Sequence, residues 1–510
     1  MGRRGARASR WALLLILLLL VLRPCAPLAQ EAAPPREPGN RPSAPAAERG
    51  QPTTTPPGLP EPLPTPPPST VPSAPPPLLP TLPVVPEPRT TPPPPTVPSV
   101  APPVFPTLPF GLPRATFRLL PSLRLAEEYT DNFNLTPRDR QDNFRTSLAP
   151  GLILFINSPF TFGVLAYTPE VVHDSSDDSV SLFHSFLGQV SWQATPHLSF
   201  AVSDVLTRTD EPSRADRLHL RSERRLFTSN IFSLNSEQLI GTITTREYYR
   251  LSTFLNDGGN DTTSHTIGAA IEVPFYRVNT ASLGYEYLRS TTSGTPDITG
   301  HQITGALTRQ IVDLTGGIAA GYAFRNGLSP DVGPGGSQTT EDFQIWNASL
   351  FGGYAPPRWW LRASLGVAGL RRESGEDIGP LPIATAELIY FFPRGTVQLA
   401  FDRGFSETFD TGDNQGVIKT QGVTASLSYS FIPALTGTVS GFYRENDFTG
   451  VGGGTRGERA NVWGAAAGVQ FRLSRQVTID FEYRHTEEIA TPRDNSYTEN
   501  RGRITLVVGF

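Results

Sequence analysis

The chain has 510 residues, and its 43 lysines and arginines against 47 aspartates and glutamates give a formal charge of −4. This balance argues against nucleic acid as a partner, because phosphate binding needs clustered positive charge. The only cysteine, Cys25, falls in a predicted leader, so a structural disulfide, a thiolate metal site and a cysteine nucleophile are not expected in the mature chain.

Residues 1–29 have the three parts of a secretory leader. Four arginines between Arg3 and Arg10 form a basic start, the run from Trp11 to Leu22 is apolar, and Ala26 to Ala29 offers a cleavage site. An apolar core of this length is too short to span a membrane comfortably as a helix. We therefore predict a signal peptide over 1–29 and export of the chain.

Residues 30–114 form a proline-rich segment. Of the 52 prolines, 34 lie at or before Arg114. Proline fixes φ and removes a backbone donor, so a disordered linker with extended polyproline II character is expected. Two interpretations stay open for its role: a tether that binds a periplasmic or cell-wall partner, or a solvated spacer.

From residue 115 onward, segments of about ten residues alternate apolar and polar side chains. From Val423 to Phe431 the odd positions are apolar or aromatic and the even positions are hydroxyls. From Val477 to Arg484 the odd positions are apolar or aromatic, and the even ones are polar or charged. A period of two places the two sets on opposite faces of a β-strand.

The connections between these segments distinguish a membrane barrel from a soluble sandwich. Tight turns, such as those at 157–159, 195–197 and 432–434, alternate with long polar loops rich in glycine and aspartate, predicted at 256–264, 325–342, 371–382, 406–419, 445–459 and 486–499. This asymmetry is typical of transmembrane β-barrels. Because lipid offers no partner to an open sheet edge, a closed barrel is the expected solution.

Aromatic residues and the chain end agree with this interpretation. Pairs such as Trp359 and Trp360 near strand ends are suited to the two membrane interfaces. Ile504, Leu506, Val508 and the terminal Phe510 share one face of the last segment, which resembles the closing strand of bacterial outer-membrane barrels. That resemblance implies that Phe510 is an insertion signal read by the outer-membrane insertion machinery.

The 396 residues after Arg114, at roughly 20 per strand and connection, predict an all-β fold: a transmembrane antiparallel β-barrel of about 18–20 strands over 115–510, with 20 favoured. The expected location is the bacterial outer membrane, with both termini and the N-terminal arm in the periplasm. A barrel of this width leaves room for an aqueous lumen.

If the apolar faces meet lipid, the opposite faces line the lumen. The predicted lumen-lining residues are Glu272, Glu286, Arg362, Asp402, Arg444, Arg472, Asp480, Glu482, Arg484 and Arg503. Charges of both signs favour a wetted pore with weak ion selectivity. The alternative is that these charges pair into a network that braces or fills the barrel.

Two short motifs point to a family. The first barrel segment contains Tyr129-Thr130-Asp131-Asn132, and Pro150-Gly151 follows in the second. This arrangement resembles the putative β-barrel porin type 2 family, which includes barrels found with exosortase and exopolysaccharide systems. The resemblance implies an outer-membrane barrel linked to polysaccharide secretion, and it supplies no catalytic residues.

The seven histidines show no metal-ligand spacing, and no Ser–His or Asp–His arrangement is evident. We therefore expect no enzymatic activity, no cofactor and no metal. The predicted function is a porin-like channel for polar solutes in contact with outer-membrane lipid. The rival prediction is a plugged structural or adhesive barrel without open-pore transport.

Overall fold

A computed structural model of the chain describes residues 116–212, 224–257, 261–276, 278–293, 296–328, 341–373, 377–408, 416–451, 458–491 and 496–509. The predicted signal peptide, the predicted proline-rich linker and Phe510 lie outside the described residues. Among the described residues, no helix is long and apolar enough to cross a membrane.

The described residues form twenty strands: β1 (Thr116–Thr130), β2 (Asn143–Asn157), β3 (Thr161–Asp174), β4 (Ser179–Thr195), β5 (Leu198–Thr209), β6 (Phe227–Ile240), β7 (Ile243–Asn256), β8 (Thr262–Phe275), β9 (Asn279–Thr292), β10 (Ile298–Ile311), β11 (Leu314–Leu328), β12 (Glu341–Tyr354), β13 (Trp359–Arg372), β14 (Asp377–Phe392), β15 (Gly395–Glu407), β16 (Val417–Ile432), β17 (Leu435–Val451), β18 (Arg459–Arg472), β19 (Val477–Thr491) and β20 (Tyr497–Gly509).

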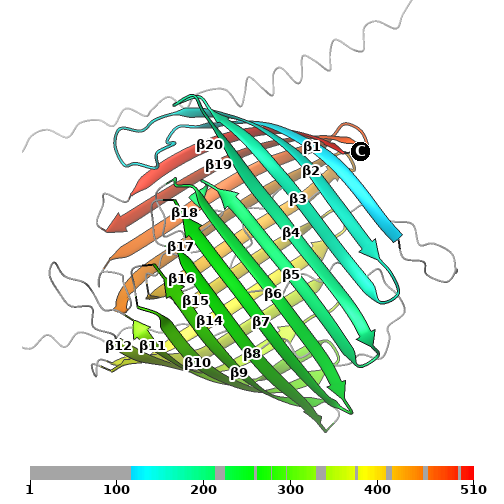
Figure 1. Cartoon of the computed structure of the whole chain (residues 1–510), viewed down its shortest axis with the longest axis vertical. Coiled ribbons are helices and arrows are strands. Elements are labelled where there is room, and N and C mark those ends of the chain that lie inside the picture. The colour runs from blue at the N-terminus through cyan, green and yellow to red at the C-terminus, as the bar shows by residue number, and fades with distance from the viewer. Residues whose placement is uncertain are drawn as a thin grey trace, which may run out of the picture. The chain divides into compact units, whose positions relative to one another are not determined.

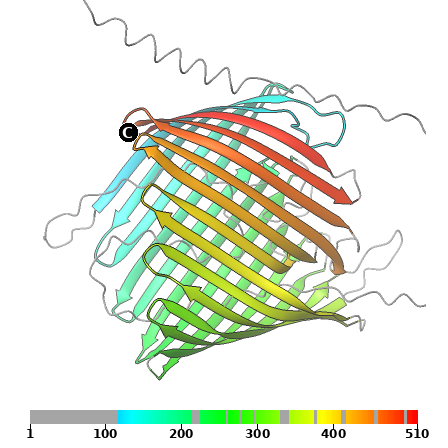
Figure 2. The ribbon, with the colours of Figure 1, turned by 180° about the vertical axis from the view of Figure 1, so that it is seen from behind.

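Each strand pairs antiparallel with its sequence neighbours, and the first strand pairs with the last. The β1–β20 ladder runs from Ser122 opposite Gly509 to Thr130 opposite Arg501, so the sheet closes into a 20-stranded barrel. Figures 1 and 2 show this closure from two sides, with β20 in red beside β1. The predicted fold and the favoured strand number are confirmed. Full closure removes the open edges that a bilayer cannot satisfy.

The connections fall into two sets. Even-to-odd connections are short, for example 196–197 and 433–434, whereas the opposite set includes 131–142, 210–226 and 329–340. We call the two ends of the barrel the short-turn end and the long-loop end.

Several strands extend farther toward the long-loop end than the sequence pattern predicted. The predicted loop at 371–382 shrinks to 373–376, and β17 continues to Val451 inside the loop predicted at 445–459. The reason is that apolar and polar side chains need to alternate only where one face of the strand contacts lipid. A strand that rises beyond the bilayer keeps its hydrogen-bond ladder but has no need of an apolar outer face.

Alternate side chains form an apolar belt around the outside. Paired strands contribute Leu123 and Leu125 of β1, opposite Pro150 and Leu148 of β2, and the same outward parity continues around the barrel. Leu350 of β12 and Leu365 of β13 lie directly opposite each other, and both are 64% exposed. An exposed apolar surface of this extent is stable only where lipid covers it.

Candidate functional site

The ten predicted lumen-lining residues all lie on the inner face, because each alternates along its strand with outward-facing apolar neighbours. On β19, for example, Asp480 and Glu482 alternate with Phe481 and Tyr483, which are 41% and 54% exposed. Their contribution to conduction stays a prediction. Phe510 lies outside the described residues, and its role as an insertion signal also stays a prediction.

Most of these predicted residues contact a partner of complementary chemistry. Arg246 binds Glu272 at 2.5 Å, and Tyr248 donates a hydrogen bond to Glu286. Further contacts join Arg444 to Asp402 at 3.1 Å and Arg484 to Glu482 at 2.8 Å, and place the Arg362 guanidinium 4.7 Å from the centre of the Trp360 ring. Arg472 lies exposed near the short-turn end of β18. The inner charges are therefore largely paired along the wall.

The densest group of charges was mostly missed by the sequence analysis. It lies on the inner face at the long-loop end of β1, β2, β3 and β20, and includes the two ends of the connection between β5 and β6. We call it the charge cluster; its members are Arg124, Glu128, Arg145, Glu170, Asp174, Asp210, Glu211, Arg224, Glu499, Arg501 and Arg503.

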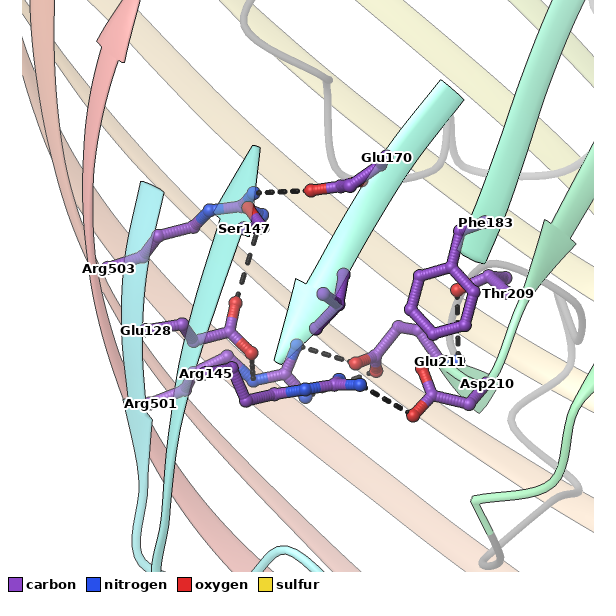
Figure 3. A pocket seen from close by; sticks show the side chains of 11 residues that line it. Glu128, Arg145, Ser147, Glu170, Phe183, Thr209, Asp210, Glu211, Arg501 and Arg503 are labelled. Carbon is purple, nitrogen blue, oxygen red and sulfur yellow. Dashed lines mark hydrogen bonds and ion pairs between the residues drawn. The ribbon is translucent and has the colours of Figure 1, made fainter. Parts of the chain in front are cut away.

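Arg501 occupies the centre of the charge cluster. Its guanidinium lies 2.8 Å from Glu211 and 2.9 Å from Glu499, and 3.8 Å from Glu128. Figure 3 shows Arg501 and Arg145 pointing toward Glu211 and Asp210. Because Asp210 and Glu211 belong to the β5–β6 connection, these ion pairs attach that connection to the inner wall.

The other end of the same connection is held in a similar way. Arg224 binds Glu211 at 2.8 Å and Glu499 at 2.7 Å, and its Nε donates to the carbonyl of Phe133 at 2.8 Å. Burial alone would lower the pKa of the Arg224 guanidinium, but the carboxylates of Glu211 and Glu499 outweigh it, and the pKa lies above its ordinary value. Arg224 therefore stays charged at neutral pH.

The aromatic ring of Phe133 supports the cluster from the β1–β2 connection. The guanidinium carbons of Arg145 and Arg224 lie 5.3 Å and 5.1 Å from the centre of this ring, within the range of cation–π attraction. The cluster lines a half-open pocket of about 50 Å³. That volume has room for a few water molecules. The cluster therefore narrows the interior on this side of the barrel.

The opposite side of the long-loop end is narrowed by apolar packing. Pairing of β14 with β15 ends at Ala384 opposite Arg403, although β14 continues along β13 to Asp377 and β15 continues along β16 to Glu407. Pro380 and Pro382 lie in the part of β14 that pairs with β13 but not with β15, and they remove two backbone donors from it. The wall is thus split between β14 and β15 beyond Arg403.

Beyond the split, the tip of the β15–β16 hairpin packs inside the barrel. We call residues 404–407 and 417–420 the β15–β16 tip. Phe405 and Val417 of the tip, 1% and 0% exposed, join one apolar cluster with residues from the inner faces of the strands across the interior, namely Ile298, Ala323, Phe343, Ile345 and Leu370.

Polar contacts hold the tip in the same position. Arg325 of β11 binds Glu407 of β15 at 3.1 Å, although the two strands are four positions apart in the wall. Arg372 of β13 donates to the carbonyl of Thr449 on β17 at 2.7 Å. Because Arg325 and Arg372 lie on the inner face, both contacts cross the interior, and the tip covers part of the lumen at the long-loop end.

The interior toward the short-turn end has a different lining. On β16 and β17 it consists of opposed hydroxyl residues: Ser426 opposite Ser440, Ser428 opposite Thr438 and Ser430 opposite Thr436. Most of them are partly exposed. Hydroxyls exchange hydrogen bonds with water readily, so this stretch of the wall is suited to contact with water. Among the described residues, no group of three or more potential ligands is placed to hold a metal ion.

A closed 20-stranded barrel with an outer apolar belt and a charged, hydroxyl-lined interior defines a porin-like outer-membrane β-barrel. The family model described as "Putative beta-barrel porin 2" matches residues 381–510. The resemblance expected from the sequence is confirmed over that part of the chain; the motifs at 129–132 and 150–151 lie outside it.

Solved barrels resemble this chain at low identity. The siderophore receptor PirA from Acinetobacter baumannii is 9% identical, with 78% of this chain and 81% of that chain covered and a TM-score of 0.44. The outer membrane protein opdK from Pseudomonas aeruginosa is 11% identical over 77% of this chain and 98% of that chain, with a TM-score of 0.37. Among proteins with curated descriptions, none is similar enough to this chain to count as a match.

Proposed function

We propose that the barrel is a channel for polar solutes across the outer membrane, narrowed at its long-loop end by the charge cluster and the β15–β16 tip. The observation that carries this proposal is the polarity of the inner face. Ionisable and hydroxyl side chains recur along it outside the apolar cluster, as at Asp480 and Glu482, whereas the outer face is mainly apolar. A barrel with a purely structural role has no need of a wetted interior.

The proposed path begins in the hydroxyl-lined half and continues past paired charges. Since acidic and basic groups are largely paired along the wall, we expect weak ion selectivity and good passage of hydrated, polar molecules. The charge cluster holds six carboxylates against five guanidiniums, counted over the members named above. Its formal excess is therefore one negative charge, which favours cations slightly. No catalytic role is assigned to any of these groups.

The proposed orientation places the short turns and both termini in the periplasm and the long loops outside the cell. In this orientation the proline-rich arm at 30–114 is free to bind a periplasmic or cell-wall partner. The insertion machinery of the outer membrane is the expected partner of the last strand. These assignments follow the general architecture of single-chain outer-membrane barrels.

As the specific solute that the channel carries, we propose a secreted polysaccharide. It comes from the resemblance to barrels found with exopolysaccharide systems. One feature of the chain is compatible with it: nearly all basic groups of the interior are guanidiniums, whose fork geometry suits the carboxylates of acidic sugars.

Liposome swelling tests the channel proposal. Full-length protein is reconstituted into liposomes loaded with an impermeant polymer, and swelling is followed in isotonic arabinose, stachyose and galacturonate. Swelling that decreases with sugar size supports a wetted channel. Liposomes that do not swell in any of these sugars, although they contain folded, heat-modifiable barrel, contradict it.

The second candidate function is a plugged structural barrel, and one observation favours it. The apolar cluster and the charge cluster both occupy the interior at the long-loop end, so both reduce its open cross-section. The two candidates differ in a measurable way. A plugged barrel gives no size-dependent swelling even after the Arg325–Glu407 contact is removed, whereas a narrowed channel swells faster.

A further inference from the structure

Tyrosine–histidine pairs recur on the outer face with nearly the same geometry. Tyr249 of β7 contacts Nδ1 of His265 on β8 at 2.9 Å, and Tyr285 of β9 contacts Nδ1 of His301 on β10 at 2.8 Å. A third pair joins Tyr167 of β3 to His184 of β4 at 2.9 Å. In each pair the tyrosine is two residues away from the residue directly opposite the histidine.

Two of these histidines lie beside one arginine. Arg289 of β9 is directly opposite His265 of β8, and Tyr287, two residues before Arg289 on the same face, is directly opposite His301 of β10. The ring centres of Tyr287 and His301 are 5.2 Å apart. We call His265, Arg289 and His301 the β8–β10 basic patch.

The basic patch lies at the border of the apolar belt that is nearer the long-loop end. Ile267 and Ile303, two residues farther from the long-loop end than His265 and His301, are 55% and 52% exposed on the same outer face. Thr263 and Thr299 lie on the other side, toward the long loops. Apolar groups on the short-turn side and hydroxyls on the long-loop side are typical of the level at which lipid headgroups lie.

The contact with tyrosine at Nδ1 leaves Nε2 of each histidine as the ring nitrogen available to a ligand. A neutral histidine whose Nδ1 accepts from a tyrosine hydroxyl carries its proton on Nε2, which is then available as a donor. Arg289 adds a planar fork of N–H groups with a permanent positive charge. The acidic group facing the patch is Asp297, which binds Arg289 at 2.8 Å, with both side chains about half exposed. An exposed ion pair of this kind exchanges readily for a stronger anion.

From this geometry we infer that the β8–β10 basic patch is a binding site for the phosphate of a lipid headgroup in the surrounding leaflet. The phosphate accepts from Arg289, His265 and His301, while the acyl chains of the same molecule cover Ile267, Ile303 and Tyr285. Complementary charge at the border of the apolar belt selects a membrane lipid over a soluble anion, because only a lipid satisfies both surfaces. The site does not depend on whether the lumen conducts.

Lipid retention measured by native mass spectrometry tests this inference. Full-length barrel is titrated with phosphatidic acid and, in parallel, with diacylglycerol, which differs from it only by the phosphate. The variants are Arg289→Gln and the double variant His265→Gln/His301→Gln. The matched control is Arg309→Gln, because Arg309 lies exposed on the same outer face of β10 but at the short-turn end.

We expect Arg289→Gln to weaken binding of phosphatidic acid about tenfold, the effect of losing one charge-assisted contact, and the histidine variant to weaken it by a smaller factor. Diacylglycerol binding and the Arg309→Gln protein should be unchanged. The inference is overturned if Arg289→Gln and Arg309→Gln have equal effects, or if neither changes retention. Displacement of the lipid by millimolar inorganic phosphate would instead assign the patch to free phosphate and overturn the lipid assignment. Heat-modifiable mobility confirms that every variant is folded.

Discussion

Glu128 on the first strand lies directly opposite Arg503 on the last, with their charged groups 3.7 Å apart on the inner face of the barrel. The ladder that closes the sheet therefore carries a complementary pair beside Arg501, which binds the β5–β6 connection. Closure of the wall and attachment of an inner connection use the same group of side chains.

Replacing Glu128 tests the contribution of this pair to the fold. Glu128→Gln removes a negative charge that balances the buried positive charges of Arg501 and Arg503. We therefore expect the free energy of unfolding to fall by about 3–5 kcal/mol. Unfolding in urea, followed by the heat-modifiable shift in electrophoretic mobility, measures it. Glu127→Gln is the matched control, because Glu127 is the adjacent residue on the exposed outer face. Equal losses in both variants would contradict the account.

Glu407→Gln tests the β15–β16 tip as a constriction. The substitution removes the charge that Arg325 binds across the interior, so the tip is held less firmly. We expect the fraction of time spent in the largest conductance level to rise about tenfold or more, since a buried ion pair is lost on one side only. Single-channel recording measures this fraction. Glu445→Gln, on the outward face of β17, should leave it unchanged, and a rise in the control alone would refute the constriction.

The apolar part of the same contact gives an independent prediction. Phe405→Ala removes a fully buried ring from the cluster, which should cost about 3–5 kcal/mol of stability and increase opening in the same direction as Glu407→Gln. Phe401→Ala, four residues earlier and outward-facing, serves as the comparison. Greater closure in Phe405→Ala would be inconsistent with a tip that blocks the lumen.

Arg501→Gln tests which charges set ion selectivity. The charge cluster loses one guanidinium and retains its carboxylates, so the reversal potential in asymmetric potassium chloride should shift toward that of a cation-selective pore. Arg472→Gln, at the exposed short-turn end, should shift it less, because solvent screens its charge. An unchanged reversal potential in Arg501→Gln would show that the path avoids the cluster.

Deletion of Phe510 tests the prediction about insertion of the barrel into the outer membrane. Deletion of this single residue should sharply lower the amount of heat-modifiable barrel in the outer membrane, since the terminal aromatic is the expected insertion signal. Immunoblotting of membrane fractions measures it. Wild-type amounts of folded barrel after the deletion would remove Phe510 from this role.

The fold was predictable from the sequence wherever lipid contact imposes an alternating pattern. The segment from Val423 to Phe431 was predicted as a strand because its outward positions must be apolar and its inward positions are hydroxyls. The long-loop half of β14 was predicted as loop because residues 371–382 form a polar stretch with the glycine and aspartate typical of long loops. In the structure this segment is a strand that pairs with β13 but not with β15, and proline is tolerated at such a strand edge.

The candidate site was predictable only in part, because it depends on contacts between distant strands. Alternation along β20 was enough to place Arg503 on the inner face. Its neighbours Glu211 and Arg224 come from a connection with no periodic pattern, and only the closure of β1 on β20 brings them together. The Arg325–Glu407 contact likewise follows from the split between β14 and β15, which no local sequence pattern reveals.

Single-channel recording of the full-length protein in a planar bilayer tests the central claim most directly. The account predicts stepwise conductance that scales with salt concentration, weak cation preference, and larger or longer openings in Glu407→Gln. An absence of conductance from folded, heat-modifiable protein, in both the wild type and Glu407→Gln, would contradict a channel and leave the plugged structural barrel.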